Sequence, residues 1–149
     1  MAKFDKIAVL AKMGETGMVP VFYHKDAETA KKVVKACYDG GVRAFEFTNR
    51  GDFAHEVFEE VVKFAAKECP ELALGVGSVV DPATAALYIQ LGACFVVGPL
   101  FNPEISKICN RRLIPYTPVA EAYRKWVLHR KQAVTSARFS LAMCSAQSW

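Results

Sequence analysis

Short apolar runs alternate with amphipathic stretches along roughly the first 118 residues of the chain. The apolar runs predict β-strands that are covered on both faces, at 19–23, 43–48, 72–77, 94–98 and 113–117. Between the strands, apolar residues recur every three to four positions, which predicts helices. These helices are expected to begin near Asp26, Gly51, Asp81 and Pro103, and an amphipathic segment at 5–12 precedes the first strand.

The predicted helices have recognisable start and stop signals. Asp26 and Asp81 are plausible N-caps, and Pro82 stands at the first helical position after Asp81. Gly40-Gly41 ends one helix and Pro70 ends the next. That second helix is expected to carry a regularly spaced apolar set, namely Phe53, Val57, Val61 and Phe64.

A strand followed by a helix about every 25 residues is typical of parallel βαβ units with right-handed crossovers. Two α/β architectures fit this rhythm: an open doubly wound sheet, and part of a (β/α)8 TIM barrel. The first strand is not followed by GxGxxG or by a phosphate-binding P-loop. A complete barrel needs about 200–250 residues, and here the rhythm stops after roughly four and a half units. We therefore expect a region at 1–118 and a separate tail at 119–149.

Composition and charge support that boundary. The chain is 52% hydrophobic and 23% charged, which is ordinary globular composition. Up to Thr117 the sequence has 14 Lys and Arg against 14 Asp and Glu, so the whole net charge of +4 comes from the tail. The 5 cysteines have no CxxC spacing and are expected to be reduced thiols of a cytoplasmic protein. No apolar run is long enough for a membrane span or a signal peptide.

Few polar residues interrupt the predicted strands near their carboxyl ends, where βα barrels carry their chemistry. Glu46 lies between two phenylalanines, so an inward, desolvated carboxyl with a raised pKa is one interpretation. A structural ion pair with Arg43 or Arg50 is the other. Arg50 follows the strand end, where its guanidinium is placed either to grip a carboxylate or to face solvent. Ser78 follows Gly75-Val76-Gly77, a weak signal for anion binding because Gly-Ser turns are common.

The order and spacing of four segments resemble the KDPG/KHG aldolase family (2-keto-3-deoxy-6-phosphogluconate and 4-hydroxy-2-oxoglutarate aldolases). The resemblance covers residues 1 to about 118, and its specific part is the GGVR-x-x-E-x-T-x-R pattern. The segments are 19–21, 40–50, 75–79 and 95–99. It implies a (β/α)8 barrel, a homotrimer and a class I aldolase. Such an enzyme cleaves a 2-keto-4-hydroxy acid to pyruvate and an aldehyde through a Schiff base.

The resemblance also implies roles for individual residues. Glu46 matches the catalytic, proton-transferring glutamate of the family. Arg50 and Ser78 match the groups that hold the pyruvate carboxylate, and Pro99 matches a proline that lines the substrate pocket. This chemistry uses a lysine amine and no metal or cofactor. The implied partner is a small keto-acid, with neither nucleic acid nor membrane involved.

The imine-forming lysine of the family, within Lys-x-Phe-Pro in the sixth strand, has no counterpart in this sequence. Back-translation from Val119 with permitted codons and a two-base shift gives Ser-Gly-Ser-Val-Ser-Glu-Met-Gly-Phe-Ala-Gln-Glu-Ala. The same shift gives Gly-Ser-Asp-Leu-Cys-Lys-Val-Phe further on, with the lysine encoded across Ala137 and Arg138. We therefore expect that the chain is a truncated aldolase whose tail is read out of frame after Pro118, through a single-base deletion or an equivalent sequencing error.

Two further expectations follow for the chain as written. Without the lysine it is a catalytically inactive fragment of an aldolase barrel, with an unpaired strand edge. The alternative interpretation of the tail is a basic helix, with Trp126 and Val127 among charged residues, in a non-enzymatic module that binds nucleic acid or anionic lipid.

Overall fold

A computed structural model of the chain describes residues 3–118, and within this range five helices and five strands alternate. The predicted tail at 119–149 lies outside the described residues. The elements, in chain order, are α1 (Lys6–Thr16), β1 (Val21–Phe22), α2 (Ala27–Asp39), β2 (Ala44–Thr48), α3 (Ala54–Glu68), β3 (Ala73–Gly77), α4 (Pro82–Leu91), β4 (Val96–Gly98), α5 (Pro103–Arg111) and β5 (Tyr116–Pro118).

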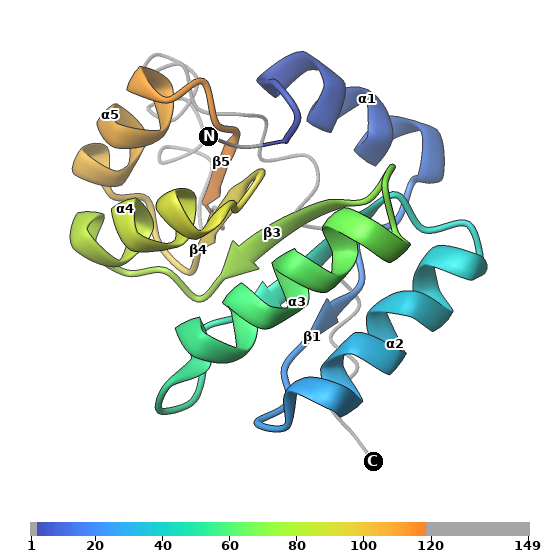
Figure 1. The fold of residues 1–149 in the computed structure, drawn as a ribbon. Coiled ribbons are helices and arrows are strands. Elements are labelled where there is room, and N and C mark those ends of the chain that lie inside the picture. The colour runs from blue at the N-terminus through green and yellow to red at the C-terminus, as the bar shows by residue number, and fades with distance from the viewer. Residues whose placement is uncertain (1–2, 119–149) are drawn as a thin grey trace.

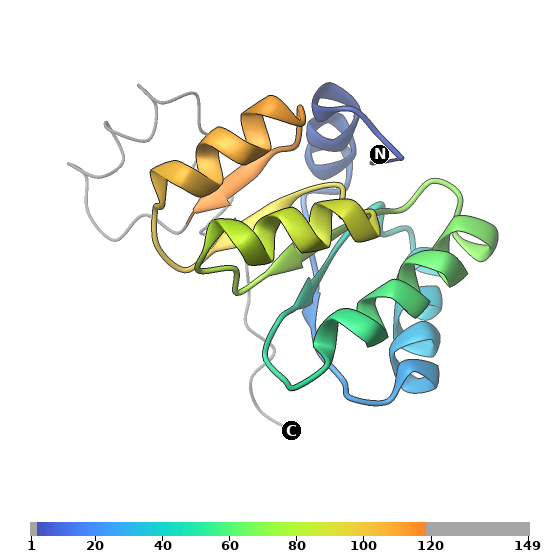
Figure 2. The same cartoon turned by 60° about the vertical axis from the view of Figure 1, so that its left-hand side comes forward.

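The five strands form one parallel sheet in the order β1-β2-β3-β4-β5. In a doubly wound sheet the strand order reverses at a switch point, and helices cover both faces. Here each right-handed crossover steps in the same direction, so α2, α3, α4 and α5 follow one another around a single face of the sheet (Figures 1 and 2). The arrangement is that of a partial (β/α)8 barrel, which resolves the two predicted architectures.

Most of the predicted helix boundaries are confirmed. The side chain of Asp26 accepts a hydrogen bond from the Thr29 backbone N–H at 2.8 Å, and Asp81 caps Thr84 in the same way at the same distance. Both caps satisfy a backbone donor that the first turn of a helix leaves unpaired. α4 ends at Gly92, whose φ of 110° is in the left-handed region that glycine tolerates.

The prediction that the second helix carries Phe53 is wrong. α3 begins one residue later, and Phe53 precedes it with φ 57° and a side chain that is 68% exposed. The left-handed turn directs this side chain away from the sheet, while Phe58 and Val61 carry the buried face. Sequence spacing did not detect the change in backbone direction at the helix start.

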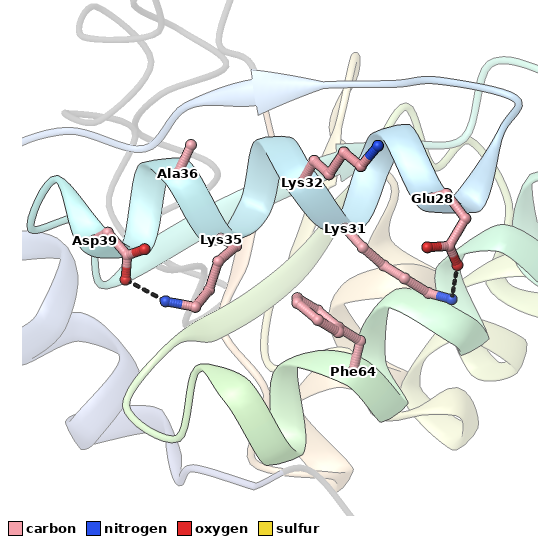
Figure 3. Close-up of a pocket in the computed structure, with 7 residues that line it drawn as sticks. All are labelled: Glu28, Lys31, Lys32, Lys35, Ala36, Asp39 and Phe64. Atoms are coloured by element: carbon pink, nitrogen blue, oxygen red, sulfur yellow. Dashed lines mark hydrogen bonds and ion pairs between the residues drawn. The ribbon is translucent and has the colours of Figure 1, made fainter.

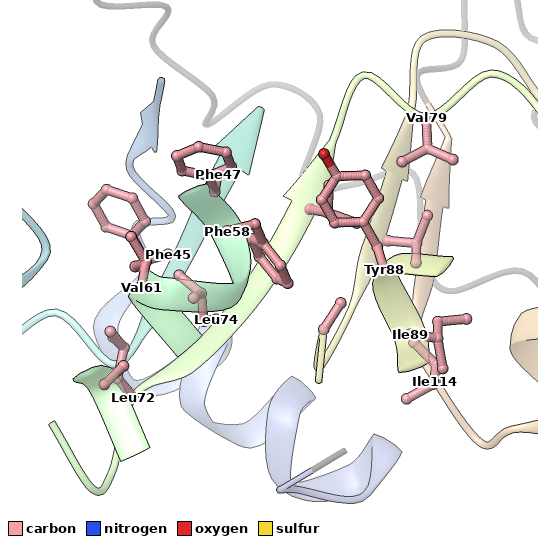
Figure 4. Packing of buried hydrophobic residues seen from close by; sticks show 14 of the residues in the cluster. Phe45, Phe47, Phe58, Val61, Leu72, Leu74, Val79, Tyr88, Ile89 and Ile114 are labelled. Carbon is pink, nitrogen blue, oxygen red and sulfur yellow. The ribbon is translucent and has the colours of Figure 1, made fainter. Parts of the chain in front are cut away.

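The outer face of the sheet packs against the helices through a chain of aromatic rings (Figure 4). The ring centroids of Phe47 and Phe58 are 5.8 Å apart, and those of Phe58 and Tyr88 are 5.0 Å apart with an edge-on geometry. Tyr23 meets Phe47 at 5.6 Å. Pairs at these distances stabilise a core beyond the area that they bury. This row of aromatic rings connects β1, β2, α3 and α4.

The inner face of the sheet has a smaller apolar cluster, and α1 closes it. Val9 and Met13 of α1 pack with the inward side chains of three strand segments, Ala44, Ala73, Cys94, Phe95 and Val97. Val9 is fully buried. Ala44 and Ala73 begin β2 and β3, so α1 covers the amino-terminal end of the inner face. Only the carboxyl end of that face is left for polar side chains.

The cysteines within the described range are unpaired, as predicted. Cys37, Cys69, Cys94 and Cys109 are all free thiols. Burial raises the pKa of the Cys109 thiol to about 12, so this group stays protonated. These thiols behave as small apolar side chains in the core, and Cys144 lies outside the described residues.

Candidate functional site

Glu46 lies on the inner face of the sheet, in the middle of β2. Its neighbours Phe45 and Phe47 pack against the helical layer, and Ala44 belongs to the inner cluster. Successive side chains of a strand alternate between faces, so Glu46 shares the inner face with Ala44 and Thr48. The inward placement predicted from sequence is therefore confirmed.

The Glu46 carboxyl lies in a desolvated environment. The side chain is 2% exposed, and Oε2 is buried without a hydrogen-bond partner among the described residues. Burial raises the pKa of Glu46 to about 7, and the positive charge of Arg50 opposes part of that rise. A carboxyl with this pKa is about half protonated at neutral pH, so it can both accept and donate a proton.

Arg50 and Ser78 meet at the carboxyl ends of neighbouring strands. Nε of Arg50 donates to Oγ of Ser78 at 3.3 Å, and the backbone N–H of Arg50 donates to the Thr48 carbonyl. Arg50 makes no ion pair with an acidic residue in the range 3–118. Its exposed guanidinium therefore keeps donors for an external carboxylate. Ser78 has φ 61°, a conformation that non-glycine residues adopt rarely and often at functional sites.

The loop that carries Arg50 is attached to its surroundings on both sides. The backbone N–H of Asn49 donates to the Gly77 carbonyl at 2.9 Å, and Oδ1 of Asn49 accepts a hydrogen bond from Oη of Tyr88, also at 2.9 Å. Tyr88 is almost fully buried, and burial raises the pKa of its phenol to about 12, so it remains a donor. The aromatic core thus anchors the loop next to Arg50.

Pro99 lies on the same edge of the sheet but two strands from Glu46. It is exposed and directly follows Gly98, the last residue of β4. The turn after it is held by Tyr116, whose Oη donates to the Leu100 carbonyl at 3.0 Å and accepts from the Asn102 N–H at 3.1 Å. Its predicted contact with substrate stays a prediction.

The alternative in which Arg43 neutralises Glu46 is wrong. Nε of Arg43 pairs with Glu71 at 3.3 Å, and its guanidinium lies 4.4 Å from the ring centroid of Tyr38. Arg43 precedes β2, at the end opposite to Arg50. Its hydrogen bonds to the Tyr38 and Val42 carbonyls complete a structural clamp. The pairing of Glu46 with Arg50 is limited to the electrostatic influence described above.

The described strands contain no lysine. Lys12 lies on α1, with Nζ 4.7 Å from the ring centroid of Phe4, and Lys107 lies on α5. Lys25 lies in the connection between β1 and α2. None of these three lysines is therefore an inward strand residue.

An outward-facing hollow lies between α2 and α3 (Figure 3). Two of its lysines are paired: Lys31 contacts Glu28 at 2.7 Å and Glu60 at 2.9 Å, and Lys35 contacts Asp39 at 2.5 Å. These partners raise the pKa of Lys31 and Lys35. The hollow therefore contains a solvated network of opposite charges on the helical layer. It differs from the surroundings of Glu46, where Oε2 has no hydrogen-bond partner among the described residues.

Sequence reasoning missed the contribution of the inner face of β3. Gly75 and Gly77 leave two places without side chains, directly beside Glu46 and Thr48 in the strand register. Two glycines spaced by one residue on the same strand face signal close approach of other groups. That signal was present in the sequence but was interpreted only as access to Ser78.

Within the described range, no helix is long and apolar enough to cross a lipid bilayer.

The sequence matches the family model of KDPG and KHG aldolase over residues 9–131. A KHG/KDPG aldolase of Escherichia coli (strain K12) is 34% identical over 101 residues, which are 68% of this chain and 46% of that protein. The chain thus spans about half the length of the curated relatives that it matches. Residues 119–131 of the matched range are not described by the structure, so the boundary at Pro118 stays a prediction.

Two solved structures share the fold. A 4-hydroxy-2-oxoglutarate aldolase/2-deydro-3-deoxyphosphogluconate aldolase from TTHB1 superposes with a TM-score of 0.75 at 24% identity, covering 88% of this chain and 61% of that one. A KDPG aldolase from Legionella pneumophila, with pyruvate captured as a covalent carbinolamine intermediate, gives 0.69 at 22% identity and covers 78% and 54%. These likenesses confirm the barrel-type fold of the described region.

Proposed function

Because this chain belongs to the KDPG and KHG aldolase family, we propose that it provides the acid–base and carboxylate-binding half of a class I aldolase site. The substrate class is a 2-keto-4-hydroxy acid, cleaved reversibly to pyruvate and an aldehyde. The observation that carries the proposal is the buried Glu46 carboxyl with a pKa of about 7, on the strand that Arg50 follows and next to the strand that Ser78 follows.

Each group has a separate task in this proposal. Arg50 and Ser78 hold the carboxylate of the keto-acid, with the guanidinium providing two parallel donors. Glu46 accepts the proton of the 4-hydroxyl as the C3–C4 bond breaks, which releases the aldehyde. The bonding electrons pass into an imine between the keto carbon and a lysine, and the resulting enamine takes a proton at C3 from Glu46. Pro99 contributes an apolar wall at the rim.

The lysine is the part that this sequence does not match. We therefore propose that the complete family protein is the active aldolase, and that residues 1–118 correspond to the first half of its barrel. We also propose that the tail is out of frame after Pro118. Nucleotide sequencing across that codon tests this: codons that do not yield the family-like reading in the shifted frame end the hypothesis.

The alternative is that the chain as written has no catalytic activity. The absence of lysine from the strands of the described range favours it. Borohydride trapping with labelled pyruvate separates the candidates. We expect no covalent adduct on this chain and one adduct per chain once the frame is restored. A stoichiometric adduct on the present chain would refute its inactivity.

The role of Glu46 is tested in the restored protein by exchange of the pyruvate methyl protons with deuterium. Glu46→Gln removes the proton acceptor while keeping the shape of the side chain, so we expect exchange to slow by roughly 10²–10⁴-fold. The matched control is Glu15→Gln on the exposed surface of α1, which should exchange normally. Unchanged exchange in Glu46→Gln would remove the assignment.

We expect the complete protein to act in the cytoplasm as an oligomer, a homotrimer by resemblance to its family. The free thiols of the described range support a reducing compartment. The solution mass of the restored protein, measured by light scattering, tests the trimer.

A further inference from the structure

Gly75 and Gly77 have no side chains, which leaves two spaces on the inner face of β3. Side chains from neighbouring strands occupy these two spaces, which we call seats. A Cβ at Gly75 would lie 2.5 Å from Cδ1 of Phe95, and closer still to other carbons of that ring. A Cβ at Gly77 would lie 2.5 Å from Cδ of Glu46 and 3.0 Å from its Cγ, with Oε1 nearer than either. The first seat thus holds an aromatic ring and the second holds the carboxyl.

We propose that Gly77 is a positioning residue, whose missing side chain seats the Glu46 carboxyl on the sheet and keeps it apart from the Arg50 guanidinium. Its catalytic consequence rests on the proposed function. The seat leaves the carboxyl buried as a proton-transfer group and leaves Arg50 free to bind an anion. Gly77 therefore lets a base and a cation share one small site without neutralising each other.

A glycine is required at position 77 to make room for the Glu46 carboxyl, and the backbone conformation does not require it. The glycines with positive φ in the described range are Gly17, Gly41 and Gly92, so Gly77 has a strand conformation that alanine also adopts. The three atoms that an added Cβ would meet first all belong to Glu46. An alanine at this position collides with that side chain before anything else.

The surroundings determine where a displaced carboxyl would go. The seat on the amino-terminal side, at Gly75, is occupied by the ring of Phe95, which is fully buried within the inner cluster. Arg50 lies on the other side, at the carboxyl edge of the sheet, and its positive charge already acts on the Glu46 carboxyl. A carboxylate displaced toward that edge regains water and meets a guanidinium, and both effects favour its charged form.

The Gly77→Ala variant of the full chain tests the proposal through the titration of Glu46. The carboxyl carbon is followed by NMR on glutamate-labelled protein, and its signal is assigned by its loss in Glu46→Gln. In Gly77→Ala we expect the midpoint to fall by about one unit or more from its value near 7. A midpoint within a few tenths of the wild-type value would overturn the proposal.

A double-mutant cycle distinguishes positioning of the carboxyl from general packing. Glu46→Ala removes all three atoms that the new Cβ would meet, so Gly77→Ala should lower the melting temperature in the wild-type background and hardly at all in the Glu46→Ala background. An equal loss in both backgrounds would mean that Gly77 serves packing alone, and the proposal would be wrong. The cycle remains informative if the single Gly77→Ala variant folds poorly.

Gly75→Ala is the matched control on the same strand face. Its Cβ meets Phe95, so we expect a lower melting temperature that is independent of residue 46 and a Glu46 titration close to that of the wild type. A titration shift as large as that of Gly77→Ala would assign the effect to any added methyl on β3 and would refute the proposal. None of these measurements uses a keto-acid, so they hold or fail separately from the aldolase assignment.

Discussion

The two ends of β2 carry an arginine each, and their surroundings differ in every respect. Arg43 precedes the strand, pairs with Glu71 and stacks on Tyr38. Arg50 follows the strand; within the described range its side chain donates a hydrogen bond to the hydroxyl of Ser78 and has no acidic ion-pair partner. At the first end charge is neutralised for stability. At the second end it is left available, which is what a binding site requires.

The interior of the sheet repeats this contrast. At the amino-terminal end, α1 closes an apolar cluster in which Val9 is fully buried. Toward the carboxyl end, Glu46 is buried with an oxygen that lacks a partner among the described residues. An unsatisfied buried polar atom lowers the stability of the fold. The amino-terminal end of the strands therefore stabilises the fold, whereas the Glu46 carboxyl destabilises it. Three predictions test this difference.

The largest effect is expected from a charge placed in the closed end. Val9→Asp introduces an uncompensated carboxylate among apolar side chains, and we expect it to lower the free energy of unfolding by about 3–5 kcal/mol. The matched change is Val80→Asp after β3, where the side chain is 65% exposed, and its effect should stay within about 0.5 kcal/mol. Urea unfolding measures both. Equal effects would contradict the assignment of the closed end to stability.

The next effect concerns the pH dependence contributed by Glu46. Its pKa in the folded chain is about 7, above the ordinary value of 4.5, so the proton binds more tightly in the folded state. The contribution to stability is therefore complete below pH 4.5 and is lost as pH rises toward and through 7. The total change corresponds to about 3 kcal/mol.

Glu46→Gln should abolish this dependence, because the amide does not titrate. We expect it to be more stable than the wild type by about 3 kcal/mol at pH 8 and nearly equal to it at pH 4. Urea unfolding at several pH values gives the two curves, and Glu15→Gln should follow the wild type. Parallel curves for Glu46→Gln and the wild type would mean that the Glu46 carboxyl is not held with a raised pKa.

The smallest effect separates the two arginines. Arg43→Ala removes an ion pair, a stacking contact and two hydrogen bonds to carbonyls, and should cost about 1–2 kcal/mol. Arg50→Ala removes one long hydrogen bond and should cost less than about 0.5 kcal/mol. Thermal unfolding compares them. A larger loss of stability for Arg50→Ala than for Arg43→Ala would mean that Arg50 is a structural residue, and it would contradict the assignment of Arg50 to anion binding.

Much of the fold was available from local patterns. The caps at Asp26 and Asp81 and the stop at Gly40-Gly41 are decided by side chains and backbone freedom within a few residues, so the sequence predicted them correctly. The placement of Phe53 was wrong because the spacing of apolar residues does not reveal a left-handed residue before a helix. The family resemblance predicted the candidate site, and burial agrees with it at Glu46.

By itself, the sequence determined which segments are strands and helices and where most helices begin, and it offered an inward Glu46 as one of two interpretations. Those features depend on short-range periodicity and capping. Only the tertiary structure decided that the strands follow one another in a single order, that Glu71 and not Glu46 neutralises Arg43, and that Gly77 makes room for a carboxyl. Each of these depends on atoms brought together from strands and loops some thirty residues apart, and contacts at that separation leave no periodic trace in the chain.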